Sequence, residues 1–241
     1  MKFYESGDSS KPVIFLFPGT CCLYSSFDHV LDGLHSYFYT VAVSYDGFDP
    51  NEKTEFYSME DECEKIEQEI KKKYGGKIKA AYGCSLGGSF VSLLIQRKRI
   101  HIDHGIIGSS DMDEAGQLMA KIQSSVVVPI MYKMVHTGML PKFMQKKLNK
   151  TDGGKKELYN GFLNMFGIGK GGSPWITKQS IYNQFYSDLV TKVQHGIDVP
   201  GTTIHVFYAT KMEKNTKRDI VLISKIRISG DTICSTKNCF A

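Results

Sequence analysis

The stretch GCSLGG, residues 83–88, joins two apolar segments of different kinds. The segment before it, Lys77 to Tyr82, has no turn residues and is predicted to form a strand. The segment after it carries large apolar residues between positions 90 and 95 and ends in the basic run 97–99, which suits the C-terminus of a helix. The stretch is therefore predicted to be a sharp turn from a strand into a helix.

Ser85 lies at the centre of a Gly-x-Ser-x-Gly pattern within this turn. In a nucleophile elbow, a serine occupies a strained strand-to-helix turn, and small residues two positions before and after it let the backbone bend sharply. Gly83 and Gly87 occupy those two positions. We therefore expect Ser85 to be a nucleophile. The other interpretation is a strand-to-helix loop rich in glycine and serine that carries no chemistry.

The composition is that of a single domain without a membrane span. With 241 residues, 41% of them hydrophobic, the chain can bury one large core, so we expect one domain over 1–241. The longest apolar stretch, 126–132, is interrupted by Pro129. The adjacent cysteines Cys21 and Cys22 disfavour a disulfide framework, and the first residues form no apolar signal core, so a soluble cytoplasmic protein is expected. Scattered histidines and unpaired cysteines predict no metal site and no cofactor.

Strand and helix patterns alternate in the first half of the chain. Continuous apolar runs predict strands at 12–17, 39–45 and 100–107, besides the strand that leads into the GCSLGG turn. Helical spacing of apolar residues predicts helices at 25–37 and 58–73, the second with Ser58 as its cap. This alternation predicts an α/β fold with a doubly wound, mostly parallel sheet.

Residues 112–197 interrupt the alternation before a strand pattern returns at 203–209. This segment is rich in methionine, phenylalanine and lysine, is largely helical in pattern, and carries more apolar residues than a surface connection needs. We interpret it as a helical cap over the active site, with Trp175 as a core residue. Methionine adapts to irregular shapes, which suits an acyl or other apolar substrate group, although the same residues could simply pack the cap on the sheet. The apolar face of the segment includes Val126, Val128, Ile130, Met134 and Met139.

Five short motifs in a fixed order resemble the α/β-hydrolase superfamily. They are FPGT at 17–20, YDGFD at 45–49, YGCSLGG at 82–88, IIGSSD at 106–111 and, after the helical insertion, IHVFYATK at 204–211. The resemblance implies the fold of these enzymes and acyl transfer to water, in which a serine attacks an ester, thioester or amide carbonyl. It also implies a small-molecule substrate with an acyl or other apolar group.

The resemblance further implies an oxyanion hole. In this superfamily, the backbone N–H after the nucleophile and an N–H from the loop after an early strand bind the oxyanion. These groups correspond to Leu86 and Thr20, with Cys21 as the alternative to Thr20. The loop usually begins with His-Gly, whereas this chain has Pro18-Gly19, which keeps the turn but lacks the histidine.

The remainder of the implied triad is incomplete. The superfamily orders it as nucleophile, acid and histidine, so the acid should follow the strand that ends near Ala209. This implies Glu213, with Asp111 as the alternative. The histidine should follow one more strand, but the sequence contains no histidine after His205. The remaining candidates for the base, each against the chain order, are His101, His104, His195 and His205.

Residues 211–241 form a basic tail, with seven Lys/Arg and three Asp/Glu. We interpret the tail as a frameshift product, because one inserted base after the Met212 codon permits a reading that resembles the ending of the superfamily, histidine included. Asp219 to Ser229 is a plausible replacement strand. The tail lacks interleaved aromatic residues and a sustained amphipathic period, so nucleic-acid or anionic-lipid binding by the tail is not expected.

Two functions are compatible with these patterns. The first is a serine esterase or thioesterase of the α/β-hydrolase type, impaired in this copy by the missing histidine. The second is a catalytically dead protein of the same fold that binds a ligand under its cap. Neither function implies a nucleic-acid partner.

Overall fold

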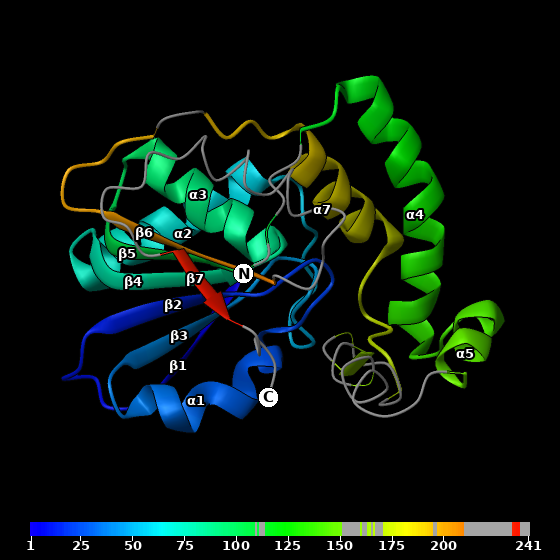
Figure 1. Ribbon diagram of the computed structural model, residues 1–241, viewed down its shortest axis with the longest axis horizontal. Coiled ribbons are helices and arrows are strands. Elements are labelled where there is room, and N and C mark those ends of the chain that lie inside the picture. Colours follow the sequence, from blue (N-terminus) through cyan, green and yellow to red (C-terminus); the bar gives the residue numbers. More distant parts are fainter. Residues whose placement is uncertain are drawn as a thin grey trace.

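The computed structural model describes residues 1–108, 110, 114–150, 160, 163–164, 166, 171–194, 197–209 and 233–236. Within them, seven strands form one sheet in the order β1-β3-β2-β4-β5-β6-β7 (Figure 1). The strands are β1 (Lys2–Ser6), β2 (Val13–Phe17), β3 (Tyr39–Ser44), β4 (Lys77–Cys84), β5 (His101–Gly108), β6 (Thr203–Ala209) and β7 (Ile233–Thr236). Only β1 runs antiparallel to its neighbour, β3, among the described pairs. The predicted mostly parallel sheet is confirmed.

Helices flank both faces of this sheet. The described helices are η1 (Tyr24–Phe27), α1 (Asp28–His35), α2 (Met59–Tyr74), α3 (Leu86–Arg97), α4 (Gln117–Thr137), α5 (Lys142–Leu148) and α7 (Lys178–Val190). Figure 1 shows α2 and α3 on one face and α1 on the other. The doubly wound arrangement predicted from the alternating pattern is therefore confirmed.

Aromatic side chains fill the core between the sheet and the helices α2 and α3. Phe90 of α3 stacks on Tyr45, with ring centroids 4.7 Å apart, and on Phe17 at 6.3 Å. Phe56 packs against Phe90 edge to face. All four rings are fully buried. Because Phe17 and Tyr45 lie where β2 and β3 end, this core supports the carboxyl edge of the sheet.

The two long helices of the 112–197 segment pack together beyond this edge. Figure 1 shows α7 between α4 and the strands, with α4 on the outside. Val128 and Met134 are buried, as predicted, but Val126, Ile130 and Met139 are exposed. The interpretation of Trp175 as a core residue is wrong: its ring is 37% exposed, and its indole N–H donates to the Phe48 carbonyl at 3.3 Å. None of the described helices is both long and apolar enough to cross a bilayer.

Several predicted features lie outside the described residues. They are the proposed acids Glu213 and Asp111, the candidate base His195 and the proposed replacement strand 219–229. Of the basic tail, the structure describes only β7, which pairs in parallel with β6.

Candidate active site

Ser85 occupies the turn between the end of β4 and the start of α3. Its φ of 53° and ψ of −126° are strained for a residue with a side chain. The Ser85 N–H donates to the Gly108 carbonyl at 3.0 Å, and the Ser85 carbonyl accepts from the Gly88 N–H at 2.8 Å. Ser85 is exposed, whereas residues 86–90 are all buried. The turn therefore presents the serine to solvent at the carboxyl edge of the sheet.

Two glycines make this turn sterically possible. A Cβ on Gly83 would lie 2.0 Å from the Gly87 carbonyl oxygen, and a Cβ on Gly87 would lie 2.1 Å from the Phe17 carbonyl oxygen. Neither distance is compatible with a side chain. The start of α3 is thus pressed against both β4 and the end of β2, as a nucleophile elbow requires.

The loop that follows β2 lies directly beside Ser85. A Cβ on Gly19 would lie 3.6 Å from the Ser85 Cβ and 3.3 Å from the Cys84 carbonyl oxygen. At the start of this loop, the Pro18 carbonyl accepts from the hydroxyl of Tyr45 at 3.2 Å. Tyr45 is fully buried, and burial raises the pKa of its hydroxyl well above the usual value, so it stays protonated as a donor.

Backbone donors on both sides of Ser85 are available to a ligand. Among the described residues, the N–H groups of Thr20 and Leu86 donate to no acceptor. Cys21, the alternative to Thr20, is already engaged, because its N–H donates to Oε1 of Gln184 at 2.8 Å. The hydrogen bonding therefore favours Thr20 over Cys21 as a donor to substrate.

Burial keeps the thiols of the cysteines beside this turn protonated. Burial raises the pKa of the Cys22 thiol to about 12, and it raises the pKa of the Cys21 thiol further. The pKa of the Cys84 thiol is also raised by burial. Because the thiolate is the reactive form, these protonated thiols are poor nucleophiles.

The described histidines proposed as bases lie away from Ser85. Nδ1 of His104 on β5 is 3.1 Å from Nε2 of His205 on β6. Strand β5 continues for four residues from His104 to Gly108, the residue that contacts Ser85, which is about 13 Å at ~3.3 Å per residue. His101 lies further back on β5 and pairs with Asp103 at 3.1 Å. Among the described residues, no hydrogen bond reaches the Ser85 hydroxyl, so the structure brings no predicted base to it.

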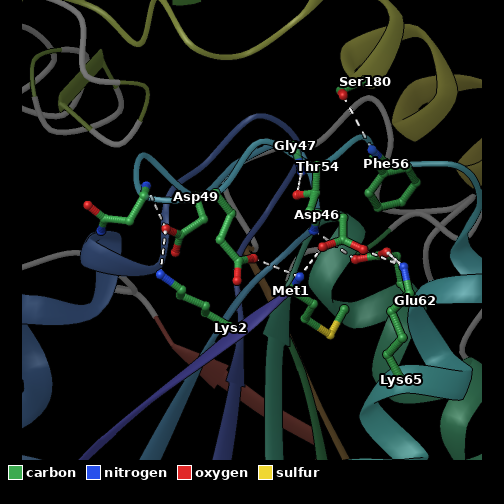
Figure 2. Close-up of polar contacts among 12 residues, drawn as sticks. Met1, Lys2, Asp46, Gly47, Asp49, Thr54, Phe56, Glu62, Lys65 and Ser180 are labelled. Carbon is green, nitrogen blue, oxygen red and sulfur yellow. Dashed lines mark hydrogen bonds and ion pairs between the residues drawn. The ribbon is translucent and has the colours of Figure 1, made fainter.

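Helix α7 is anchored to the loops at the carboxyl edge. The Asn183 side-chain amide donates to the Phe56 carbonyl at 2.8 Å. Figure 2 shows the second contact, in which the Ser180 hydroxyl accepts from the Phe56 N–H at 3.3 Å. Gln184, the residue after Asn183, binds the loop after β2. One face of α7 therefore contacts both loops that surround the Ser85 turn.

A charged cluster that the sequence did not reveal lies just after β3 (Figure 2). The carboxylate of Asp46 contacts both the amino group of Met1 and the ammonium of Lys65. The fully buried Glu62 accepts from the Asp46 N–H at 3.0 Å and pairs with Lys65 at 3.0 Å. Burial, and then the charge of Asp46, raise the pKa of Glu62 to about 7. Since these charges pair with one another, the cluster is a structural support for the loop after β3.

Within the part of the chain that the structure describes, no three histidine, cysteine or acidic side chains are grouped as metal ligands would be. The residues around Ser85 instead offer a hydroxyl and backbone N–H donors. Such a site can bind and attack a polarised carbonyl group.

Solved structures with a similar architecture include a member of the α/β hydrolase family. A putative α/β hydrolase family protein from Desulfitobacterium hafniense matches with a TM-score of 0.72 and 14% identity, covering 94% of this chain and 87% of that chain. The enol-lactonase from Burkholderia xenovorans LB400 matches with a TM-score of 0.65 and 11% identity, covering 94% and 84%. MenH from S. aureus matches with a TM-score of 0.64 and 12% identity, covering 94% and 86%. No protein-family model and no curated protein matches the sequence.

The fold is thus that of the α/β hydrolases. At 11 to 14% identity, this likeness defines the fold and leaves the activity to be argued from the site itself.

Proposed function

We propose that the chain is a serine hydrolase, with Ser85 as the nucleophile that transfers an acyl group from an ester or thioester to water. The observation that carries this proposal is the exposure of Ser85 in a strained turn, with two backbone N–H groups in the segments beside it that donate to no acceptor among the described residues. Strain of this kind is retained where the surrounding structure enforces it, and it clusters at active sites.

The proposed reaction has two steps. The Ser85 oxygen attacks the carbonyl carbon, the bond to the alcohol or thiol leaving group breaks, and the proton of the Ser85 hydroxyl passes to that leaving group. Water then attacks the acyl-enzyme and releases the acid. In both steps a negative charge develops on the carbonyl oxygen, which the N–H groups of Thr20 and Leu86 would stabilise. The start of α3, with its positive dipole end, lies at the same place.

The general base is the missing part of the proposed active site. The proposed acid Glu213 lies outside the described residues, and the sequence contains no histidine after His205. We therefore expect weak turnover, because the loss of the base typically lowers the rate of such a triad by several powers of ten. The helices α4 and α7 are proposed as the cap, and the apolar residues of the 112–197 segment favour a substrate with an apolar group.

A fluorophosphonate probe tests the nucleophile directly. We expect the probe to label Ser85 slowly, because the base is missing, with the adduct located by peptide mass spectrometry, and Ser85→Ala to abolish the label. Ser89→Ala is the matched control, since Ser89 is a buried serine one turn along α3 whose hydroxyl lies 3.3 Å from that of Ser110. Equal labelling of the parent and Ser85→Ala would contradict the proposal.

The missing histidine favours a second candidate function, a catalytically dead protein that binds an apolar ligand under its cap. A parent chain that resists the probe even at long exposure would favour this binder. Comparison with a chain carrying the restored reading frame after Met212 separates the two functions. If the frameshift interpretation is correct, the restored chain gains hydrolysis of p-nitrophenyl esters or acyl-CoA thioesters, and Ser85→Ala removes the gain.

A further inference from the structure

Helix α4 carries a stripe of exposed apolar side chains on its outer side. At about 100° per residue, its five members fall within an arc of about 120° around the helix axis. The members of this α4 apolar stripe are Leu118 (74% exposed), Met119 (53%), Ile122 (51%), Val126 (64%) and Ile130 (43%). Contiguous apolar surface of this kind on a folded protein marks an interaction site.

Within the part of the chain that the structure describes, the stripe takes no part in attaching α4 to the other elements. That contact uses the opposite side of the helix, where Ala120, Ser124 and Val128 are buried next to α7. Just before α4, the Ala115 N–H donates to the Leu189 carbonyl at 2.8 Å. Figure 1 shows α4 as the outermost long helix, with α7 on its inner side. Helix α4 therefore has two apolar sides, and the described residues cover only the side that faces α7.

Lysines lie on the helix that carries the stripe and on the segment that follows it, whereas the exposed acidic Glu114 lies just before it. The sequence from 117 to 150 contains six lysines and no aspartate or glutamate, so this segment alone carries +6, against +5 for the whole chain. Lys121 and Lys133 are exposed on α4 itself, and Lys142 and Lys146 are exposed on α5. The partner must accordingly combine an apolar interior with a negatively charged surface.

We propose that the α4 apolar stripe docks this protein on the surface of an anionic lipid bilayer. The apolar side chains enter the boundary between headgroups and acyl chains, and the lysines lie against the lipid phosphates. A second copy of the chain is a poor occupant, because joining two α4 helices would bring Lys121 and Lys133 of both copies together with no aspartate or glutamate from either helix. This docking is independent of Ser85 and goes beyond the proposed hydrolysis.

Vesicle co-sedimentation of the full chain tests this proposal. Vesicles of phosphatidylcholine alone are compared with vesicles that also contain phosphatidylglycerol, at low and at high salt. We expect binding to the anionic vesicles, weak binding to the neutral ones, and a loss of binding as salt screens the lysines. Equal binding to both vesicle types, or no binding to either, would overturn the proposal.

Two variants separate the apolar from the electrostatic contribution. In Ile122→Gln/Val126→Gln the stripe is interrupted by residues of good helix propensity, and we expect vesicle affinity to fall at least 10-fold. The Lys121→Gln/Lys133→Gln variant should lose roughly 10- to 30-fold, at about 1 kcal/mol for each lysine near an anionic surface. Unchanged melting temperatures would show that both variants are folded.

Matched controls remove the same groups elsewhere. Tyr57→Gln removes a 66% exposed aromatic residue, and Lys71→Gln/Lys72→Gln removes two exposed lysines from α2. Neither control should change vesicle binding. Controls that weaken binding as much as the α4 variants would refute docking through α4. A parent chain that sediments as a dimer without lipid, and an Ile122→Gln/Val126→Gln variant that is monomeric, would assign the stripe to self-association instead.

Discussion

Oε1 of Gln184 on α7 accepts the backbone N–H of Cys21 at 2.8 Å, although the two residues are 163 positions apart. Cys21 has a φ of 59°, in the left-handed region that a residue with a side chain rarely adopts. Gln184 is fully buried, and its Nε2 has no hydrogen-bond partner among the described residues. A helix of the 112–197 segment therefore holds the loop beside Ser85 in a strained conformation.

Substitution of this glutamine should impair the reactivity of Ser85. Gln184→Met keeps the size of the side chain but leaves the buried Cys21 N–H without an acceptor, so the loop carrying Thr20 should relax. We expect the rate constant for fluorophosphonate labelling to fall about 10- to 100-fold, because a displacement of about 1 Å in such a site can cost ~10²-fold. The probe's binding constant should be unchanged.

The control for this prediction is Asn183→Ala on the same helix. It removes a hydrogen bond of the same kind, but one that holds Phe56 instead of the loop beside Ser85. Amide hydrogen exchange tests the same role without an activity assay. Gln184→Met should accelerate exchange at the Cys21 N–H, whereas Gln184→Glu, which retains an acceptor for it, should not. Equal effects of Asn183→Ala and Gln184→Met on exchange at Cys21 would refute the specific role of Gln184.

The tight packing of the Ser85 turn predicts that Gly87→Ala destabilises the protein. Its methyl group would lie 2.1 Å from the Phe17 carbonyl oxygen, which is backbone and cannot move without shifting β2. We expect a loss of about 1 to 3 kcal/mol in the free energy of unfolding, measured by urea denaturation. Gly33→Ala in α1 is the control, because a Cβ there meets no atom within 4 Å; that variant should be neutral or more stable. Equal stability of Gly87→Ala and the parent would be incompatible with this packing.

The buried Glu62 predicts a pH dependence of stability. Its pKa is raised from the usual 4.5 to about 7, so the folded protein holds this proton more tightly than the unfolded chain does. The contribution of Glu62 to stability is therefore fully present below pH 4.5 and is lost as the pH rises through about 7. The loss is roughly 3 kcal/mol at 1.36 kcal/mol per pKa unit.

The Glu62→Gln variant tests this dependence. Glutamine can still accept the Asp46 N–H but cannot ionise, so the decline in unfolding free energy between pH 4.5 and 7 should become shallower. Glu64→Gln on the same helix is the control, because the hydrogen bonds of Glu64 to Arg99 and Arg97 lower its pKa and place its effect below that window. A parent and a Glu62→Gln variant with parallel pH profiles would disprove the raised pKa.

The spacing of apolar residues and glycines predicted the sheet and the Ser85 turn well. Strands and helices with a buried face need apolar residues at regular spacing, and this spacing can be read directly from the sequence. The apolar run at 12–17 forms β2 over 13–17, and the predicted helix capped by Ser58 is α2, with the Ser58 hydroxyl accepting from the Asp61 N–H. Strand β1 was not predicted, since KFYES has a mixed burial pattern and no apolar run. Trp175 was assigned to the core from its size, but its ring lies at the surface.

The amino-acid sequence by itself determined the alternation of strands and helices from β2 to β5, the glycines that let the chain bend at Ser85, and the lack of a histidine after His205. Such local features follow from backbone sterics and from the period of apolar residues. Both depend only on residues that are close together in the sequence. Only the tertiary structure decided that Gln184 engages Cys21, that Glu62 is buried beside Asp46, and that one apolar side of α4 faces outward. Those relationships join residues far apart in the chain or depend on which side of a helix is covered, and packing alone sets them.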